Sequence, residues 1–304
     1  MSRAATVKER EAAPLPDGRG SAEFSIMDNH IRQIEIHDRS LVPAEAEMWI
    51  TIVAERQTPT TELRGRLMGP RCPYANTVEV AYPLRPLPPG RASESSALTR
   101  RVVIPEACLW EPESPFLYQG PIELWQDGQR CDRLMLSHGL RSFHLDERGL
   151  RVNGRPLRLR GRSVTVCTEK DALALRQAGY NLLIAPVEEG ALPLWEHADR
   201  LGFLMLVRVP KDGQPARQHL EILSRHASCL GWLVEEGEHP SFHLLPRTGL
   251  VGLMCESSPR DSSLSRADFV FGPAELANFG KPLLVKGEGL VEPPEAARIL
   301  GSAG

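Results

Sequence analysis

Short segments of apolar and β-branched residues recur between Asn29 and about residue 148, and each has the length of a β-strand. Clusters of Pro, Gly and Asp separate these segments, and Asp127-Gly128 is suited to the positive φ angles of a tight hairpin turn. Several short strands with turn signals between them predict an antiparallel, immunoglobulin-like β-sandwich over residues 25–148. The expected strands are 30–39, 48–55, 77–84, 100–105, 121–126 and 131–137.

From about residue 149 the pattern changes to fully apolar segments that alternate with helical ones. Strands with two apolar faces, each followed by a helix, are typical of parallel βα units. A closed barrel of such units needs eight strands and commonly about 250 residues. Seven expected strands therefore predict a reduced (β/α) TIM-type barrel over residues 149–304. The expected strands are 155–166, 180–187, 203–209, 229–236, 249–257, 267–273 and 281–288, and the expected helices are 169–179, 191–202, 215–228 and 293–300.

A barrel that lacks one strand leaves unpaired strand edges, which attract other strands or chains. We therefore expect the N-terminal arm, a partner chain or a second copy in a homo-oligomer to cover the gap. Residues 1–24 form this arm, because they show no periodicity and are rich in Ala, Pro, Gly, Arg and Glu, a composition typical of disorder.

The arm has no apolar core of the kind that a secretory signal requires. No apolar run in the chain approaches the roughly 20 residues that span a bilayer. These two observations predict a cytoplasmic protein that does not enter a membrane.

Of the 304 residues, 41% are hydrophobic and 25% are charged, and the formal net charge is -3. This balance is typical of a globular protein and gives no electrostatic reason to expect a nucleic-acid partner. No pair of cysteines has the short spacing of a metal or redox motif, so we expect no metal and treat the cysteines as small buried apolar residues. They are Cys72, Cys108, Cys131, Cys167, Cys229 and Cys255.

A cofactor is not expected either, because the glycine pattern 287–289 lacks the strand and helix context of a dinucleotide site. One metal alternative stays open around the fourth barrel strand. There, His226, His239 and His243 lie near Glu235, Glu236 and Glu238, although at irregular spacing.

Three stretches carry a resemblance to a known family. The segment 109–118 (LWEPESPFLY) is similar to a sandwich motif, 139–161 contains the junction GLR…VNGRPLRLRG, and 175–181 with 198–202 reads LRQAGYN…ADRLG. In this order and spacing they resemble glycoside hydrolase family 2, which implies a β-sandwich followed by a (β/α) barrel. The same residues have structural roles: Asn153-Gly154 suits a hairpin, and we expect Trp110 and Tyr118 to pack the edge of the sandwich.

The resemblance implies retaining hydrolysis by two glutamates that follow barrel strands four and seven. The matching stretches are 232–237 and 281–288, and they place Gly237 and Gly287 where these glutamates are expected. Glu236 and Glu288 each lie one residue away. Neighbouring strand residues point to opposite faces, although a bulge at a strand end can restore the direction. The candidate substrate-binding residues are Asn181, Trp232 and Glu235.

Other positions also depart from the family pattern. Ile184 stands where an arginine is usual in the second strand, and Arg208 stands near the end of the third strand, where a glutamate is usual. The leading hypothesis is a family 2-like protein that has lost hydrolysis and acts as a carbohydrate-binding or interaction scaffold. The alternative is an active retaining β-glycosidase for galactosides, mannosides or glucuronides, with Glu236 as acid/base and Glu288 as nucleophile. A third possibility is a remnant without an activity of its own.

Overall fold

The computed structural model divides the chain into two compact units that interleave in sequence. The sandwich unit comprises Met1–Pro70, Val78–Ala107 and Tyr118–His138, and the barrel unit comprises Arg71–Thr77, Cys108–Leu117 and Gly139–Gly304. The last division thus falls after His138 instead of the predicted residue 148. The residues described are 2–3, 29–42, 44–88, 98–146, 148–187, 192–210, 217–236, 245–246, 248–258, 264–278, 280–287 and 299–304.

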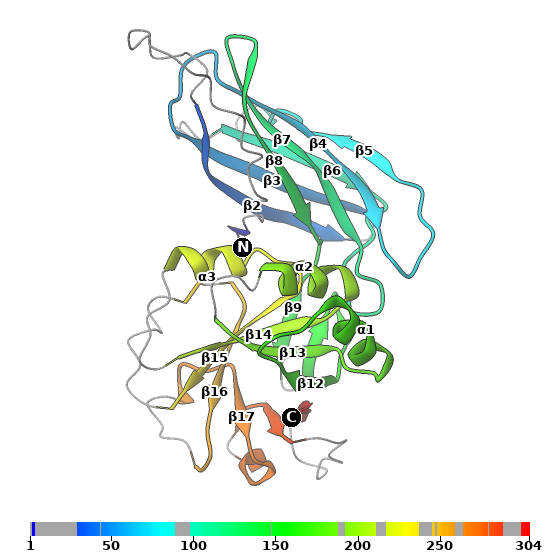
Figure 1. The fold of residues 1–304 in the computed structure, drawn as a ribbon, viewed down its shortest axis with the longest axis vertical. Helices are drawn as coiled ribbons and strands as arrows, with labels where there is room; N and C mark the ends of the chain where they lie inside the picture. The colour runs from blue at the N-terminus through cyan, green and yellow to red at the C-terminus, as the bar shows by residue number, and fades with distance from the viewer. Residues whose placement is uncertain are drawn as a thin grey trace. The chain divides into compact units, whose positions relative to one another are not determined.

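The sandwich unit consists of two four-stranded antiparallel sheets (Figure 1), which confirms the predicted β-sandwich. The buried pair Asp38 and His138, one from each sheet, forms a hydrogen bond of 3.0 Å, so the two sheets face each other. One sheet has the order β1 (Ser2–Arg3), β2 (Ile31–Val42), β3 (Glu45–Ala54), β6 (Leu98–Pro105); the other has the order β5 (Val80–Pro83), β4 (Glu62–Arg71), β7 (Leu117–Gln126), β8 (Gln129–His138).

Strand alternation builds the core of the sandwich. In β3 the inward residues Ala46, Met48, Ile50 and Ile52 are each at most 1% exposed, whereas their neighbours are not buried. The β7–β8 hairpin turns at Asp127-Gly128, as predicted, with φ angles of 51° and 76°.

Two features of the sandwich unit differ from the sequence prediction. Ser2 and Arg3 pair with Ile36 and His37 on β2, so part of the arm is a strand, while residues 4–24 lie outside the described part. The strand β4 was not predicted, because its Gly, Pro and three Arg residues hide the alternation.

A small three-stranded sheet lies within residues 143–156 of the barrel unit. Its order is β11 (Arg155–Pro156), β10 (Gly149–Val152), β9 (Phe143–Asp146). The predicted hairpin at Asn153-Gly154 is present, with φ angles of 52° and 80°. Trp110 does not pack the sandwich edge as expected: it is fully buried in the core of the barrel unit, where Leu117 and Leu150 also lie.

The barrel itself is closed by eight parallel strands, which confirms the predicted TIM-type barrel and corrects the expected number of seven strands. Around the barrel the described residues form α1 (Glu169–Gln177), α2 (Leu192–Leu201), α3 (Arg217–Leu223) and the short 3-10 helix η2 (Ala274–Asn278). The strands are β12 (Leu159–Ser163), β13 (Leu182–Pro186), β14 (Leu204–Val209), β15 (Cys229–Glu235), β16 (Leu250–Met254), β17 (Phe269–Gly272), β18 (Leu283–Lys286) and β19 (Ile299–Ala303).

The eighth strand, β19, lies where a helix over 293–300 was predicted; residues 291–298 lie outside the described part. It pairs with both β18 and β12 and so closes the ring. The seam requires glycine: a Cβ on Gly301, whose φ is +150°, would lie 1.8 Å from the carbonyl oxygen of Leu159. Because the ring closes within the chain, a partner is not needed to cover an open edge.

Two apolar layers follow from strand alternation in the barrel. An inner core draws residues from strands on all sides of the ring, such as Leu159, Leu206, Leu233 and Leu284. An outer core packs the opposite strand faces against the helices, through residues such as Trp195 of α2. Each strand residue can therefore be assigned to the inside or the outside of the barrel. None of the described helices combines the length and apolar character that crossing a membrane requires.

Candidate functional site

The carboxyl end of β15 carries Glu235, which continues the inner face of the barrel. Leu233, two residues earlier, belongs to the inner core, whereas Trp232 and Val234 belong to the outer core. Glu235 is exposed to solvent, so its carboxylate lies at the mouth formed by the carboxyl ends of the strands.

Trp232, a predicted substrate-binding residue, is fully buried in the outer core. Its indole Nε1 donates a hydrogen bond of 3.3 Å to the carbonyl oxygen of Thr248. The structure therefore gives it a packing role and no surface at the mouth.

Glu236 follows the opposite face from Glu235. Its backbone N–H donates to the carbonyl oxygen of Met254 at 3.2 Å, which extends the pairing of β15 with β16 by one residue. The electrostatic effect of the Glu236 carboxylate on an outer-core cysteine agrees with this outward direction. Burial, followed by the charges of Glu236 and Glu256, raises the pKa of the Cys255 thiol to about 11, and Cys255 belongs to the outer core.

The carboxyl end of β18 presents a lysine to the mouth. Leu284 belongs to the inner core, and Lys286 lies two residues further on the same face, where its Nζ is 2.6 Å from Oε1 of Glu256. The next residue, Gly287, stands where the resemblance places the nucleophile; it is exposed, and a Cβ built there would meet nothing within 4 Å. Glu288, the predicted nucleophile, lies outside the described residues.

Asn181 lies at the other end of the barrel, directly before β13. Its Oδ1 accepts from the backbone N–H of Arg160 at 2.8 Å, and its Nδ2 donates to the carbonyl oxygen of Arg158 at 2.8 Å. Both polar groups of the side chain thus join β13 to β12, which gives Asn181 a structural role away from the mouth.

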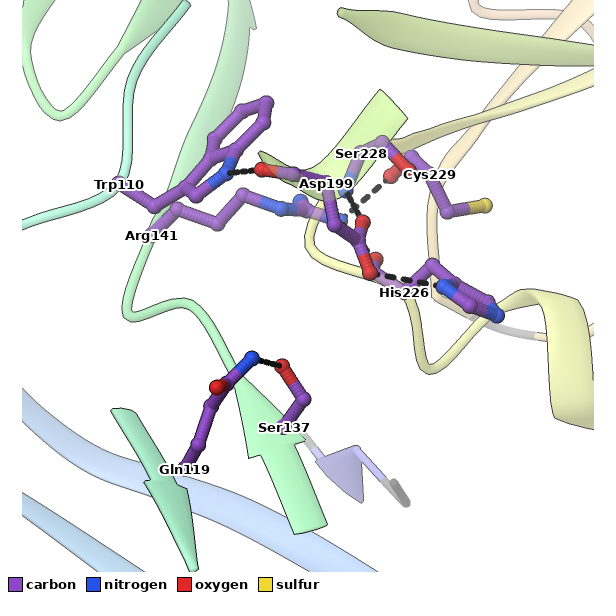
Figure 2. A network of polar contacts seen from close by, with 8 residues as sticks. All are labelled: Trp110, Gln119, Ser137, Arg141, Asp199, His226, Ser228 and Cys229. Atoms are coloured by element: carbon purple, nitrogen blue, oxygen red, sulfur yellow. Dashed lines mark hydrogen bonds and ion pairs between the residues drawn. The ribbon is translucent and has the colours of Figure 1, made fainter. Parts of the chain in front are cut away.

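A buried polar network holds the amino end of β15 (Figure 2). The carboxylate of Asp199, from α2, accepts from the backbone N–H of Ser228 at 2.7 Å and lies 2.7 Å from Nδ1 of His226. Nη2 of Arg141 donates to the carbonyl oxygens of His226 and Cys229, at 2.9 and 2.6 Å. These contacts fix the amino end of β15, the strand that carries Glu235 at its carboxyl end. A separate pair in the sandwich unit, Gln119 and Ser137, is also drawn.

The same network bears on the metal alternative. His226 is committed to Asp199 at the amino end of β15, whereas Glu235 lies at its carboxyl end. Glu238, His239 and His243 lie outside the described residues. Within the described ranges no group of three or more His, Cys, Asp or Glu side chains is arranged to hold a metal. Three cysteines are buried, as expected, and Cys72, Cys108 and Cys131 are half-buried.

Comparisons with known proteins identify the class of fold. No family model matches the chain. The fold is that of glycoside hydrolase family 2 proteins: a family 2 member from Bacteroides cellulosilyticus aligns with a TM-score of 0.67 and 17% identity over 88% of this chain and 42% of that one. The β-glucuronidase of Bifidobacterium dentium, complexed with coumarin-3-O-glucuronide, aligns with a TM-score of 0.64 and 16% identity, over 90% of this chain and 56% of the other.

In sequence, the chain is 24% identical over 128 residues to the β-galactosidase BoGH2A of Bacteroides ovatus, which corresponds to 38% of this chain and 15% of that protein. The resemblance noted from the motifs is therefore confirmed at the level of the fold. The chain spans less than two thirds of the length of each of these relatives, at 42%, 56% and 15%.

Proposed function

We propose that this chain is a glycoside hydrolase family 2-like protein that has lost hydrolysis and binds carbohydrate at the carboxyl-end mouth of its barrel. The observation that carries the proposal is the end of β18. An inward Lys286, paired with Glu256, is followed by Gly287 at the position where the family resemblance requires the nucleophilic carboxylate. A lysine and a glycine there cannot attack an anomeric carbon as a carboxylate does.

The acid side supports the same proposal. Retaining hydrolysis needs two carboxyl groups roughly 5–5.5 Å apart on either side of the scissile bond. Of the adjacent glutamates after β15, Glu235 follows the inner face, and Glu236 follows the outer face near Cys255. Among the described residues, Glu235 therefore has no carboxylate on β18 to form a catalytic pair with.

The second barrel strand, β13, also departs from the family pattern. Ile184, at the position where the family pattern has an arginine, is fully buried in the inner core. An isoleucine fills the barrel but cannot orient a carboxylate with a bidentate guanidinium. What remains at the mouth is a mixture of exposed carboxylate and ammonium groups, which suits hydrogen bonds to sugar hydroxyls.

One observation favours a second candidate function. A carboxylate follows each of the two relevant strands, one residue after β15 in Glu236 and two residues after β18 in Glu288. An active retaining β-glycosidase would use Glu236 as acid/base and Glu288 as nucleophile. The names of the relatives suggest β-galactosides and β-glucuronides as substrates of this alternative.

The test combines turnover and binding. Wild-type protein is assayed with a panel of aryl β-glycosides and titrated with the corresponding methyl β-glycosides by calorimetry. We expect binding without turnover, and loss of binding in Glu235→Gln. Turnover that disappears in Glu236→Gln and in Glu288→Gln, but persists in the exposed control Glu62→Gln, would establish the active alternative instead.

A further inference from the structure

Two cysteines stand at the start of the two segments that the barrel unit takes from within the sequence of the sandwich unit. Cys72 lies in the segment 71–77, and Cys108 opens the segment 108–117. The strand β4 ends directly before Cys72, and β6 ends shortly before Cys108. Because the two cysteines are distant in sequence, no short motif marks them as a pair.

Both segments are anchored to the last turn of α2, in each case two residues after the cysteine. The hydroxyl of Tyr74 donates to the carbonyl oxygen of Leu201 at 3.1 Å. The indole Nε1 of Trp110 donates to the carbonyl oxygen of Asp199 at 2.8 Å (Figure 2). The two acceptors belong to one helical turn, so the two anchors lie close together.

Backbone contacts support each anchor. An isolated β-bridge joins Cys72 to Ala75, so the chain turns back on itself around Tyr74. On the other segment, the carbonyl group of Pro112 packs so closely on Gly202, directly after α2, that a Cβ on this glycine has no room. Both segments are therefore held at the carboxyl end of the same helix.

The electrostatics of the thiols agree with this convergence. Burial, followed by the charge of Cys72, raises the pKa of the Cys108 thiol. The Coulomb energy of two charges falls as their separation grows, so an influence of one thiol on the other is expected where the two are neighbours. Both side chains are half-buried, which leaves them within reach of a small oxidant in solution.

We propose that Cys72 and Cys108 form a reversible disulfide that staples the two segments together at the carboxyl end of α2. The oxidant is a small disulfide of the glutathione type. One cysteine thiolate attacks a sulfur atom of oxidised glutathione and releases the first glutathione; the other attacks the resulting mixed disulfide and releases the second. Two protein thiols are thereby oxidised to one disulfide, one glutathione disulfide is reduced to two thiols, and the two thiol protons pass to the released glutathione molecules.

The bond closes the chain from Cys72 to Cys108, which includes β5 and β6, into a loop. Such a loop restricts the unfolded chain and so favours the folded state. The staple also acts on the helix whose Asp199 accepts from the backbone N–H of Ser228 and so holds the amino end of β15. Oxidation should therefore stabilise the barrel unit, whether or not its mouth binds carbohydrate.

Peptide mapping of the wild type tests the pairing. Native protein is incubated with oxidised glutathione, its remaining thiols are blocked with iodoacetamide, and it is digested with trypsin without reduction. We expect the peptides 72–91 and 102–130 to be recovered as one linked product that dithiothreitol separates. Cys131 falls in a different peptide, so a bond to Cys131, or a separate glutathione adduct on each cysteine of the pair, would overturn the proposal.

Thermal unfolding tests the consequence. The oxidised wild type should unfold about 2–4 °C above the reduced protein. This difference should vanish in Cys72→Ser and in Cys108→Ser, and should persist in Cys131→Ser, the matched control at a half-buried cysteine of the sandwich unit. A linked product without a rise in Tm, or a rise that survives Cys108→Ser, would contradict the staple.

Discussion

At the residue scale, two adjacent glutamates lie in different surroundings because strand side chains alternate. Glu235 follows the inner core residue Leu233, and Glu236 follows the outer core residue Val234. A single residue therefore decides whether a carboxylate reaches the mouth or the outer layer. The reactivity of Cys255 reports which carboxylate lies on the outer side.

The pKa of Cys255, raised from 9.0 to about 11, predicts slow alkylation. At pH 8 only about one thiol in a thousand is then ionised, against about one in ten at the ordinary pKa. Removing the Glu236 charge lowers this pKa and should speed iodoacetamide labelling of Cys255 about two- to fivefold, measured by peptide mass spectrometry. Glu235→Gln is the matched control. Acceleration by Glu235→Gln alone would reverse the assignment of the two faces.

The buried carboxylate of Asp199 should be among the most sensitive positions of the barrel unit. Asp199→Ala leaves the Ser228 N–H and His226 Nδ1 without their acceptor, so the free energy of unfolding should fall by about 3–5 kcal/mol in urea titrations. Asp146→Ala, at a half-buried surface position, should cost less than about 1 kcal/mol. Equal effects of the two substitutions would show that the network contributes little.

The sequence predicted where the candidate glutamates lie along the chain, but not which face of the barrel each one occupies. The glutamates after strands four and seven were found by their place in the motifs. The face of each depends on strand register, and a bulge between Met205 and Leu206, opposite the start of β15, shifts that register. Arg208 was noticed only as a departure from the family pattern, because the burial of its Nε without a hydrogen-bond partner among the described residues is a property of the folded barrel.

At the element scale, closure of the barrel depends on the β12–β19 seam. Gly301→Ala places a Cβ against the carbonyl oxygen of Leu159 at a φ of +150°, so neither strand can keep its place. We expect a loss of about 2–3 kcal/mol in the free energy of unfolding and earlier proteolysis near β19. The comparison is Gly280→Ala: Gly280 also has a positive φ, but a Cβ there meets nothing within 4 Å. If the two variants unfold alike, backbone conformation alone would account for the effect.

Asn181 should matter for stability and not for ligand binding. Asn181→Ala removes two hydrogen bonds of 2.8 Å that join β13 to the backbone at Arg158 and Arg160. We expect a loss of about 1–3 kcal/mol in urea unfolding and an unchanged calorimetric affinity for sugars. A weakened affinity with unchanged stability would restore Asn181 as a substrate-binding residue.

The predicted elements were most reliable where periodicity was strong. Seven barrel strands and three of the helices are present because their apolar runs and glycine stops are local signals. The strands β4 and β19 were missed for opposite reasons. Polar and glycine residues obscure β4, whereas β19 (ILGSA) is short, contains Gly301 and follows a segment that resembles a helix. Its strand conformation depends on two neighbours distant in sequence, β12 and β18.

At the scale of the whole molecule, the barrel unit takes residues from inside the sequence of the sandwich unit. Trp110 is fully buried in its inner core, and its indole Nε1 donates to the carbonyl oxygen of Asp199 at 2.8 Å. Tyr74 donates its hydroxyl to the carbonyl oxygen of Leu201 at 3.1 Å. The barrel is therefore not an independent C-terminal segment, although its strands all follow residue 158.

This interleaving predicts that the fragment 139–304 does not fold to the native barrel. Without Trp110 the inner core loses its largest side chain, and Trp110→Ala in the full chain should already lower the free energy of unfolding by about 3–5 kcal/mol. Trp49→Ala, a half-buried residue on the outer face of the sandwich, should cost much less. For the fragment, we expect a broad, non-cooperative thermal transition by circular dichroism. A cooperative transition at the same midpoint temperature as the full chain would contradict this. It would show that the barrel strands alone specify the fold and that segment 108–117 is not required.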